Sequence, residues 1–207
     1  MKPIEPVFVD FQKDMSKLEA QAGIPVLYKK NETTGLFNLM YVIETGTNTD
    51  PVLNLAFQYL DYLGTSQKSA EQIKQEFYNI ACGYGITAGA DRSYVSLSGL
   101  SENMPAAMQL FEELIADAQP NEAILENLKA DMIKARADAK LNQGANFGAL
   151  NRYATFGPEY VRKNTLTDEQ LQALTSEELL DKIKAFANLE HTVLYYGPKS
   201  GNEVVAD

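Results

Sequence analysis

The amino-acid sequence predicts an α+β fold, in which an antiparallel sheet carries helices packed on one of its faces. Segments with strand character come in adjacent pairs separated by a turn, whereas a parallel sheet would alternate single strands with helices. Amphipathic helical segments follow each pair. The chain has 207 residues, of which 45% are hydrophobic and 22% are charged, and this composition is typical of a globular domain with a full core.

The first predicted pair of strands covers residues 24–30 and 36–46. Both segments are rich in Val, Leu and Tyr, and the sequence NETTG between them favours a turn. The pattern therefore predicts a β-hairpin. Its apolar alternation is imperfect, as expected for strands that are partly covered on both faces.

Two helices are predicted next. Asp50 as N-cap and Pro51 at the first helical position begin a helix over residues 52–65, in which apolar residues recur with helical spacing. Gly64 marks the end of this helix. The sequence SAEQ, residues 69–72, is a capping box and predicts the start of the second helix.

The second predicted pair of strands lies within residues 84–100, around a Gly-Ala-Asp turn, and its second member, SYVSLSGL, alternates cleanly. Pro105 then leads into a strongly amphipathic helix, and residues 121–142 continue as a helix with mixed charges on its outer face. The sequence QGANFGALNRYATFGPEYVRKN is predicted as a further helix that contains glycines.

Two short helices and one strand complete the predicted elements. Each of these helices has its own capping box, formed by Thr167 with Gln170 and by Thr175 with Glu178. The sequence HTVLYYG, residues 191–197, predicts a closing strand.

Both ends of the chain are predicted to lie outside the domain. Residues 1–22 show no strong period, and Pro3 and Pro6 keep the backbone extended, so that we expect an inter-domain linker. Residues 23–198 are predicted as a single α+β domain. Residues 199–207 begin with a turn and are predicted to be a truncated tail, whose Val-Val pair suggests a further element.

The net charge and the hydropathy pattern exclude several classes of partner. The formal net charge is -10, so that no excess of Lys and Arg is available to neutralise phosphates, and we expect no nucleic-acid partner. No stretch approaches the ~20 apolar residues of a membrane span, and we expect no membrane partner. The N-terminus has no apolar signal core, which predicts a cytoplasmic protein, or a periplasmic one if a longer bacterial parent carries the signal peptide.

The single cysteine and the single histidine limit the chemistry of the chain. Cys82 has no intrachain partner for a disulfide, and we expect a buried, unreactive thiol. Since His191 is the only histidine, several histidines cannot form a metal site within the chain. A Ser-His-Asp triad would have to use a residue at the start of a strand, so that we expect His191 to be structural. The sequence contains neither a phosphate-binding loop nor a Gly-x-Ser-x-Gly elbow.

Acidic pairs and tyrosines are the remaining candidates for a site. We expect the acidic pairs on solvated helix faces or in first helical turns, where carboxylates complement the helix dipole. These pairs are Glu112–Glu113, Asp168–Glu169 and Glu177–Glu178. The chain has 11 tyrosines, which include Tyr59, Tyr62, Tyr195 and Tyr196. We expect these four at core edges and interfaces, and the alternative is a substrate-binding groove or a domain contact.

The sequences LGTSQKSAEQIKQEF and AGADRSYVSLSGL carry a resemblance to a known family. With the order of the elements around them, they resemble one domain of the pitrilysin/insulysin family of zinc peptidases, to which mitochondrial processing peptidase is related. The resemblance covers roughly residues 24–197. It implies the LuxS/MPP-like fold and, in catalytic members, an inverted His-x-x-Glu-His motif on the helix that precedes Gly-Thr.

The resemblance places the motif positions on Leu55, Gln58 and Tyr59. Positions 55 and 59 share one helix face, but Leu and Tyr supply no imidazole for zinc. Gln58 stands where the family has its general base and cannot accept a proton as a carboxylate does. A further glutamate ligand of the family would lie on the later helix, where this chain offers Asp131 and Lys134. The sequence therefore predicts no catalytic residue and no metal ligand in this domain.

The resemblance also implies a role. Long members of the family resemble four related domains in tandem, and this chain is most like the third. We therefore expect a non-catalytic domain that helps to form a peptide-binding chamber, binds peptide or unfolded polypeptide, and contacts a catalytic domain. Zinc is expected in a sister domain. One alternative is a stand-alone scaffold or assembly subunit that pairs with a separate catalytic chain, and another is an enzyme of unrelated chemistry built from acids, tyrosines and Cys82.

Overall fold

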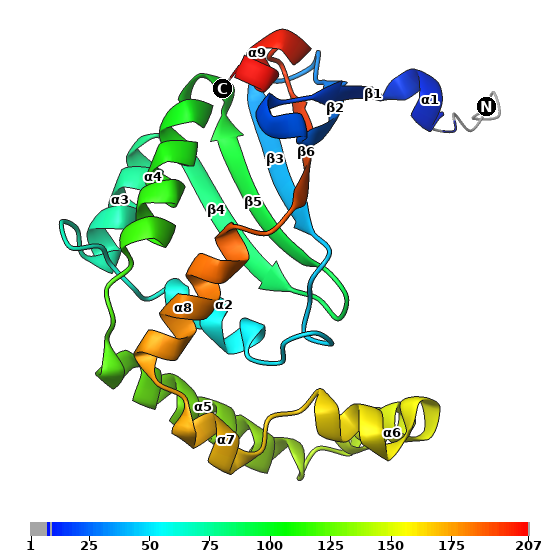
Figure 1. Cartoon of the computed structure of the whole chain (residues 1–207), viewed down its shortest axis with the longest axis vertical. Coiled ribbons are helices and arrows are strands. Elements are labelled where there is room, and N and C mark those ends of the chain that lie inside the picture. Colours follow the sequence, from blue (N-terminus) through cyan, green and yellow to red (C-terminus); the bar gives the residue numbers. More distant parts are fainter. Residues whose placement is uncertain (1–7, 9, 207) are drawn as a thin grey trace, which may run out of the picture.

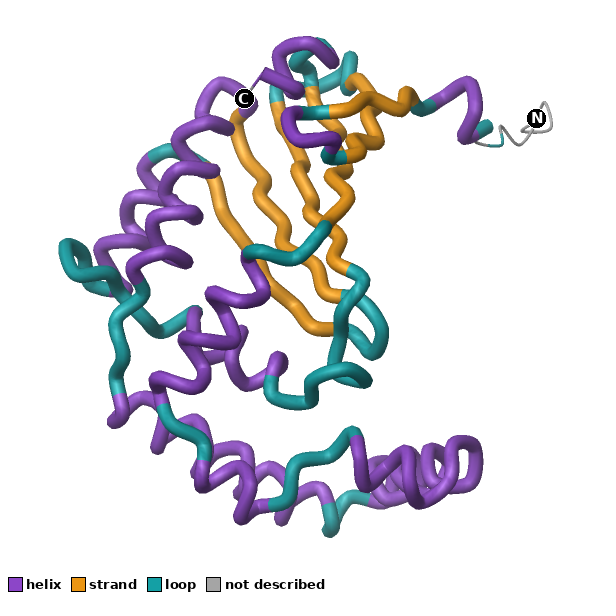
Figure 2. Tube along the Cα trace, in the orientation of Figure 1, coloured by secondary structure: helices purple, strands orange, loops and turns teal. Residues whose placement is uncertain are grey.

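The computed structural model describes residue 8 and residues 10–206. Within this part of the chain, six strands form one sheet in the order β1-β2-β6-β3-β5-β4, which Figure 2 shows as a single layer. The strands are β1 (Ser16–Glu19), β2 (Pro25–Lys30), β3 (Leu36–Ile43), β4 (Cys82–Ala88), β5 (Ser93–Leu100) and β6 (His191–Gly197).

Four helices build the core on one face of this sheet (Figure 1). They are α2 (Leu53–Leu60), α3 (Ala70–Asn79), α4 (Met104–Asp117) and α8 (Ser176–Ala187). Along β3, the buried Phe37 and Leu39 alternate with the exposed Leu36 and Asn38, because successive side chains point to opposite faces. The predicted α+β class, with helices packed on one face, is confirmed.

A helical arm extends beyond the sheet layer. It consists of α5 (Glu122–Ala139), α7 (Asp168–Ala173) and α6 (Gln143–Lys163), and Figure 1 shows α6 at its far end. α5 packs on α7 and contacts α2. The remaining elements are α1 (Phe11–Asp14), η1 (Gln21–Gly23), η2 (Ser101–Asn103) and α9 (Gly201–Ala206). No helix of the described residues has the length and the apolar composition needed to cross a membrane.

The predicted hairpin of residues 24–30 and 36–46 is wrong, although both strands exist. β6 lies between β2 and β3, parallel to β2 and antiparallel to β3, so that one pair of the sheet is not antiparallel. The loop of residues 31–35 crosses the end of β6, where the backbone N–H of Asn31 donates to the carbonyl of Gly197 at 2.7 Å. Five residues can span the roughly 10 Å of two strand spacings, so that the turn composition does not require a tight hairpin.

The helix starts follow the sequence signals closely. All three predicted capping boxes are confirmed, at the starts of α3, α7 and α8. The Asp50 carboxylate accepts the N–H of Val52 at 3.0 Å, but regular α-helix begins only at Leu53 and ends at Leu60, inside the predicted 52–65. The N-cap is Val52 and not the predicted Asp50. At the other end a turn follows Leu60, in which the N–H groups of Tyr62 and Leu63 donate to carbonyls three residues earlier.

Ordered elements lie in the ranges predicted as linker and tail, namely α1, β1, most of η1 and α9. β1 pairs with β2, and α9 contacts both strands. The sequence missed β1 because four mostly exposed residues carry no alternating apolar pattern. Pro3 and Pro6 lie outside the described residues, and the predicted domain boundaries stay predictions.

The junction of β5 with β4 depends on a glycine. Gly99 has a φ of +152°, and a Cβ there would lie 2.4 Å from the carbonyl oxygen of Ala81 and 2.5 Å from the Cys82 Sγ. We expect Gly99→Ala to lower the free energy of unfolding by about 1–3 kcal/mol, because the strands must separate to admit the methyl group. Urea denaturation measures this loss. Gly83→Ala on β4 is the matched control, since its Cβ would meet nothing within 4 Å, and an equal loss in both variants would contradict the packing argument.

Candidate functional site

Two of the three residues at the family's motif positions, Leu55 and Tyr59, point into the core. Leu55 and Tyr59 are buried, with exposed fractions of 1% and 0%, on the face of α2 that packs toward α8 and β4. Gln58 lies on the exposed side of the same helix. The neighbouring Phe57 packs edge-on against Phe186 of α8, with ring centroids 4.7 Å apart. The helix therefore presents apolar packing surface where a catalytic member would present ligands.

The phenol of Tyr59 joins three helices. It accepts the backbone N–H of Asn121 at 2.6 Å, just before α5, and it lies 2.8 Å from the hydroxyl of Ser176 at the start of α8. The backbone N–H of Ser176 in turn donates to the Glu122 carboxylate at 3.0 Å. Because these contacts occupy the phenol oxygen, Tyr59 is a structural connection in this domain.

These side chains do not fit a zinc ion. Leu55 has no donor atom, and the oxygen of Tyr59 is already hydrogen-bonded. Among the described residues, no group of three or more His, Cys, Asp and Glu side chains is placed to hold a metal. The prediction that the domain has no metal ligand and no catalytic residue rests on this chemistry and remains a prediction.

The later helix contains a buried charge that the sequence analysis did not find. Asp131 and Lys134 on α5 are exposed, whereas the side chain of Lys129 is only 4% exposed. Its ammonium group donates to the carbonyl of Gln172 in α7 at 3.0 Å and to the Glu126 carboxylate at 2.8 Å. Lys129 thus fixes α7 on α5. The sequence around it, which includes the exposed Asp131 two residues later, does not indicate that this lysine is buried.

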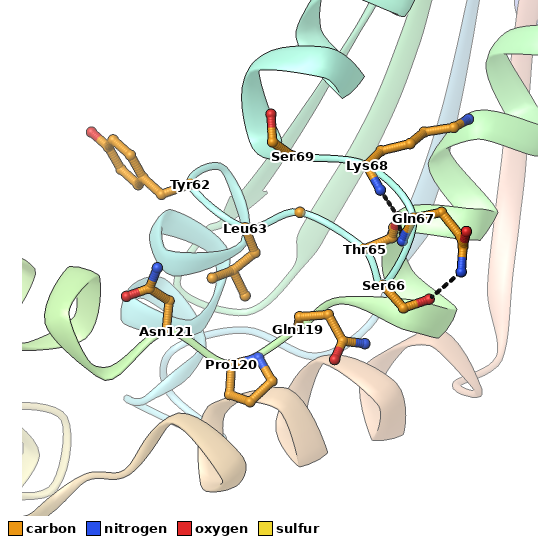
Figure 3. A pocket seen from close by; sticks show the side chains of 11 residues that line it. Tyr62, Leu63, Thr65, Ser66, Gln67, Lys68, Ser69, Gln119, Pro120 and Asn121 are labelled. Atoms are coloured by element: carbon orange, nitrogen blue, oxygen red, sulfur yellow. Dashed lines mark hydrogen bonds between the residues drawn. The ribbon is translucent and has the colours of Figure 1, made fainter.

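The Leu-Gly-Thr segment after α2 lines a small cavity of about 350 Å³ (Figure 3). Its walls are the loop of residues 62–69 and the segment 119–121. A Cβ on Gly64 would lie 2.3 Å from the carbonyl oxygen of Lys68, which explains the glycine. The Asp117 carboxylate accepts both the N–H and the hydroxyl of Ser66, and these bonds lower its pKa. The loop is therefore held by hydrogen bonds to the end of α4.

A larger groove lies over the sheet between α4 and α8 and has a volume of about 590 Å³. Its lining is mostly apolar and comes from β3, β5, β6, α4, α8 and Ile24, and it includes Ile43, Val95, Leu97, Met108, Ile115 and Phe186. Tyr41 and His191 lie on its floor with their rings edge-on at 5.4 Å. Glu112 and Lys184 belong to opposite walls. The groove suits apolar side chains of a ligand, with one charge of each sign on its walls.

The other candidates of the sequence analysis fall at structural positions. His191 begins β6 as predicted, and its Nδ1 lies 3.0 Å from the carbonyl of Leu189. Cys82 is half-buried in β4, and this burial raises its thiol pKa, as expected for an unreactive thiol. The predicted first-turn positions are confirmed for the acidic pairs of α7 and α8. Tyr41 was not singled out, although its alternating position in β3 places it on the helix-covered face.

The described residues have the fold of a peptidase M16 domain. The chain matches three solved structures with the same TM-score, 0.78. The peptidase M16 inactive domain from Pseudomonas fluorescens is 21% identical, over 93% of this chain and 48% of that chain. The periplasmic protease PqqL from Escherichia coli is 17% identical, over 96% and 22%. A mutant of the ferredoxin protease FusC, in complex with Arabidopsis ferredoxin, is 14% identical, over 98% and 23%.

These comparisons confirm the predicted resemblance at the level of the fold. This chain spans between about a fifth and a half of the length of the solved chains that it matches. Neither a protein-family profile nor a curated protein matches the sequence.

The role of the Tyr59 hydroxyl can be tested by removing it. We expect Tyr59→Phe to lower the free energy of unfolding by about 1–3 kcal/mol, because buried groups at Ser176 and Asn121 lose their partner. Tyr62→Phe is the control, since Tyr62 is 50% exposed. Chemical denaturation compares the two variants, and equal stability of Tyr59→Phe and the unchanged chain would show that the phenol is not a structural connection.

The groove predicts a change of stability at alkaline pH. Burial, and secondarily the Glu112 carboxylate, raises the pKa of Tyr41 from 10.0 to about 12. The neutral phenol therefore stabilises the folded chain fully below the pKa of the unfolded chain, and this contribution decreases as the pH rises from about 10 toward 12. We expect Tyr41→Phe to show a shallower loss of stability in this window, measured by urea denaturation at several pH values. Tyr196→Phe, at an exposed position, should leave the slope unchanged.

Proposed function

We propose that this chain is a non-catalytic domain of a zinc metalloendopeptidase. The observation that carries the proposal is the orientation of α2, whose Leu55 and Tyr59 are buried at the positions where a catalytic domain would hold zinc. Tyr59 connects helices, so that the domain keeps the shape of the family while its motif helix serves packing. Zinc and the general base would lie in a catalytic partner domain, in the same polypeptide or in a separate subunit.

The domain would help to form a chamber that binds peptide or unfolded polypeptide. The apolar groove between α4 and α8 supports this part of the proposal, because unfolded segments expose apolar side chains that a folded substrate buries. One of the matched structures is a protease in complex with a protein, ferredoxin, which is consistent with a polypeptide ligand. In this arrangement the domain contributes binding surface and the partner contributes the chemistry.

The proposal predicts that the isolated chain binds no stoichiometric zinc and cleaves no peptide. Metal analysis after dialysis, and fluorogenic peptide assays with and without a chelator, measure both properties. The peptidase assembled with its catalytic partner domain should contain zinc and lose turnover with the chelator. Removal of this domain from the assembly should reduce turnover of long polypeptides.

Tight stoichiometric zinc in the isolated chain, or turnover that a chelator abolishes there, would refute the proposal. The natural reading frame decides whether the catalytic partner belongs to the same polypeptide or to a separate subunit. A His-x-x-Glu-His motif upstream in the same frame places the partner in one polypeptide, whereas its absence favours a scaffold subunit that pairs with a separate catalytic chain.

A further inference from the structure

Nothing in the described part of the chain covers the first two thirds of α6. Every residue from 143 to 156 is exposed, and no residue of α6 is buried. Two of its side chains hydrogen-bond to the described chain outside the helix. Asn146 donates to the carbonyl of Lys140 at 2.9 Å, and Tyr160 near its end donates to Asn48 at 2.8 Å. Figure 1 shows the helix at the far end of the arm, away from the sheet.

The composition of α6 does not explain a stable solitary helix. It contains Gly144 and Gly148, a kink at Gly157 with a φ of +80°, and Pro158. Each interior glycine costs about 1 kcal/mol relative to alanine, and helices in proteins draw most of their stability from tertiary packing. A 21-residue helix of this composition therefore requires a surface to pack on.

α6 also carries the largest group of exposed apolar side chains in the described chain. Phe147, Leu150, Tyr153 and Phe156 are exposed by 71%, 63%, 52% and 57%. At about 100° per residue, consecutive members of this group are about 60° apart, so that the four side chains together cover about half of the helix circumference; we call this strip the α6 face. Together they expose roughly 500 Å² of side chain, compared with roughly 800 Å² for each side of a standard protein interface. An apolar area of this size is comparable to the largest patch on a typical monomer, and such patches are often functional.

Charge and symmetry argue against a second copy of this chain as the cover. α6 carries Arg152, Arg162 and Lys163 against the single acid Glu159, in a chain of net charge -10. A two-fold dimer through the α6 face would bring two cationic helices together. A head-to-tail contact with the acidic remainder of a second copy would have to close into a ring, since otherwise it leaves one α6 face open and propagates into a filament.

The lengths of the matched structures favour a different domain. The M16 inactive domain structure is about twice as long as the part that this chain covers, and PqqL is longer still. Units of this fold thus occur in polypeptides that provide further protein surface beside them.

We propose that the α6 face docks on the catalytic partner domain, at an apolar surface bordered by carboxylates that face Arg152. This inference rests on the proposed function and specifies the surface through which the two domains meet. The groove between α4 and α8 then stays open to substrate, because the α6 face lies on the arm and not over the sheet.

Site-specific photo-crosslinking in the assembled peptidase tests the docking. Benzoylphenylalanine replaces Tyr153 on the α6 face or, as the matched control, Tyr78, which is 79% exposed on α3. We expect the Tyr153→benzoylphenylalanine protein to crosslink to the catalytic partner domain, and the control to give at most a tenth of that yield. Crosslinks only to a second copy, only to substrate, or to nothing would overturn the inference.

A second measurement uses variants that leave the domain's own contacts intact. Phe147→Ser with Leu150→Ser should increase amide hydrogen exchange of residues 143–156 at least tenfold in the assembled peptidase, while Tyr78→Ser leaves it unchanged. Unchanged exchange in the double variant would also overturn the inference. If the assembly is a zinc-dependent peptidase but α6 crosslinks to no partner domain, only the docking fails, whereas absence of zinc-dependent activity overturns the proposed function itself.

Discussion

The phenol of Tyr59 is the constraint on which the arrangement of the helices depends. Its oxygen is fully buried and lies at the meeting point of α2, the start of α5 and the start of α8. Two of these helices belong to the layer over the sheet and the third begins the arm. A buried hydroxyl without hydrogen-bond partners lowers the stability of the fold, whereas one with partners favours the single arrangement that keeps them in place. The phenol therefore fixes the position of the arm relative to the layer of helices over the sheet. Position 59, where the resemblance places a zinc ligand of catalytic members, thus connects helices in this domain. A histidine at this position would need other hydrogen-bond partners to make the same connection.

The sequence predicted those parts of the fold that depend on neighbouring residues. Three capping boxes appear where predicted because each consists of a side chain and a backbone group three residues apart. The insertion of β6 between β2 and β3 could not be predicted in this way, since it pairs Val26 with Val193 and no local pattern encodes so distant a partner. β1 was not predicted for a different reason. Its residues are almost all exposed, so that only its pairing with β2 identifies it as a strand.

The candidate site also has parts that the sequence could predict and parts that depend on contacts between distant residues. The motif positions Leu55, Gln58 and Tyr59 were assigned by the family resemblance, which counts them back from Gly64-Thr65. The partners of Tyr59 could not be located, because Ser176 is more than a hundred positions away. Lys129 was missed because an isolated lysine in a charged helix resembles a solvated one, and its burial depends on the carbonyl of Gln172 in another helix. The groove was missed because it is a gap between two helices, and its shape depends on how far α4 and α8 diverge over the sheet.

The central place of β6 has a consequence for how this domain forms during synthesis. β6 is the last strand in the sequence, yet it joins β1 and β2 on one side to β3, β5 and β4 on the other. Until residue 197 has left the ribosome, the nascent chain holds two separate sheet fragments, and the edges of β2 and β3 have no strand between them. Open edges of this kind pair readily with other chains. The sheet is therefore completed only when β6 pairs with strands that were synthesised much earlier. A chain truncated before β6 would expose the unpaired backbone edges of β2 and β3, which can pair with other chains.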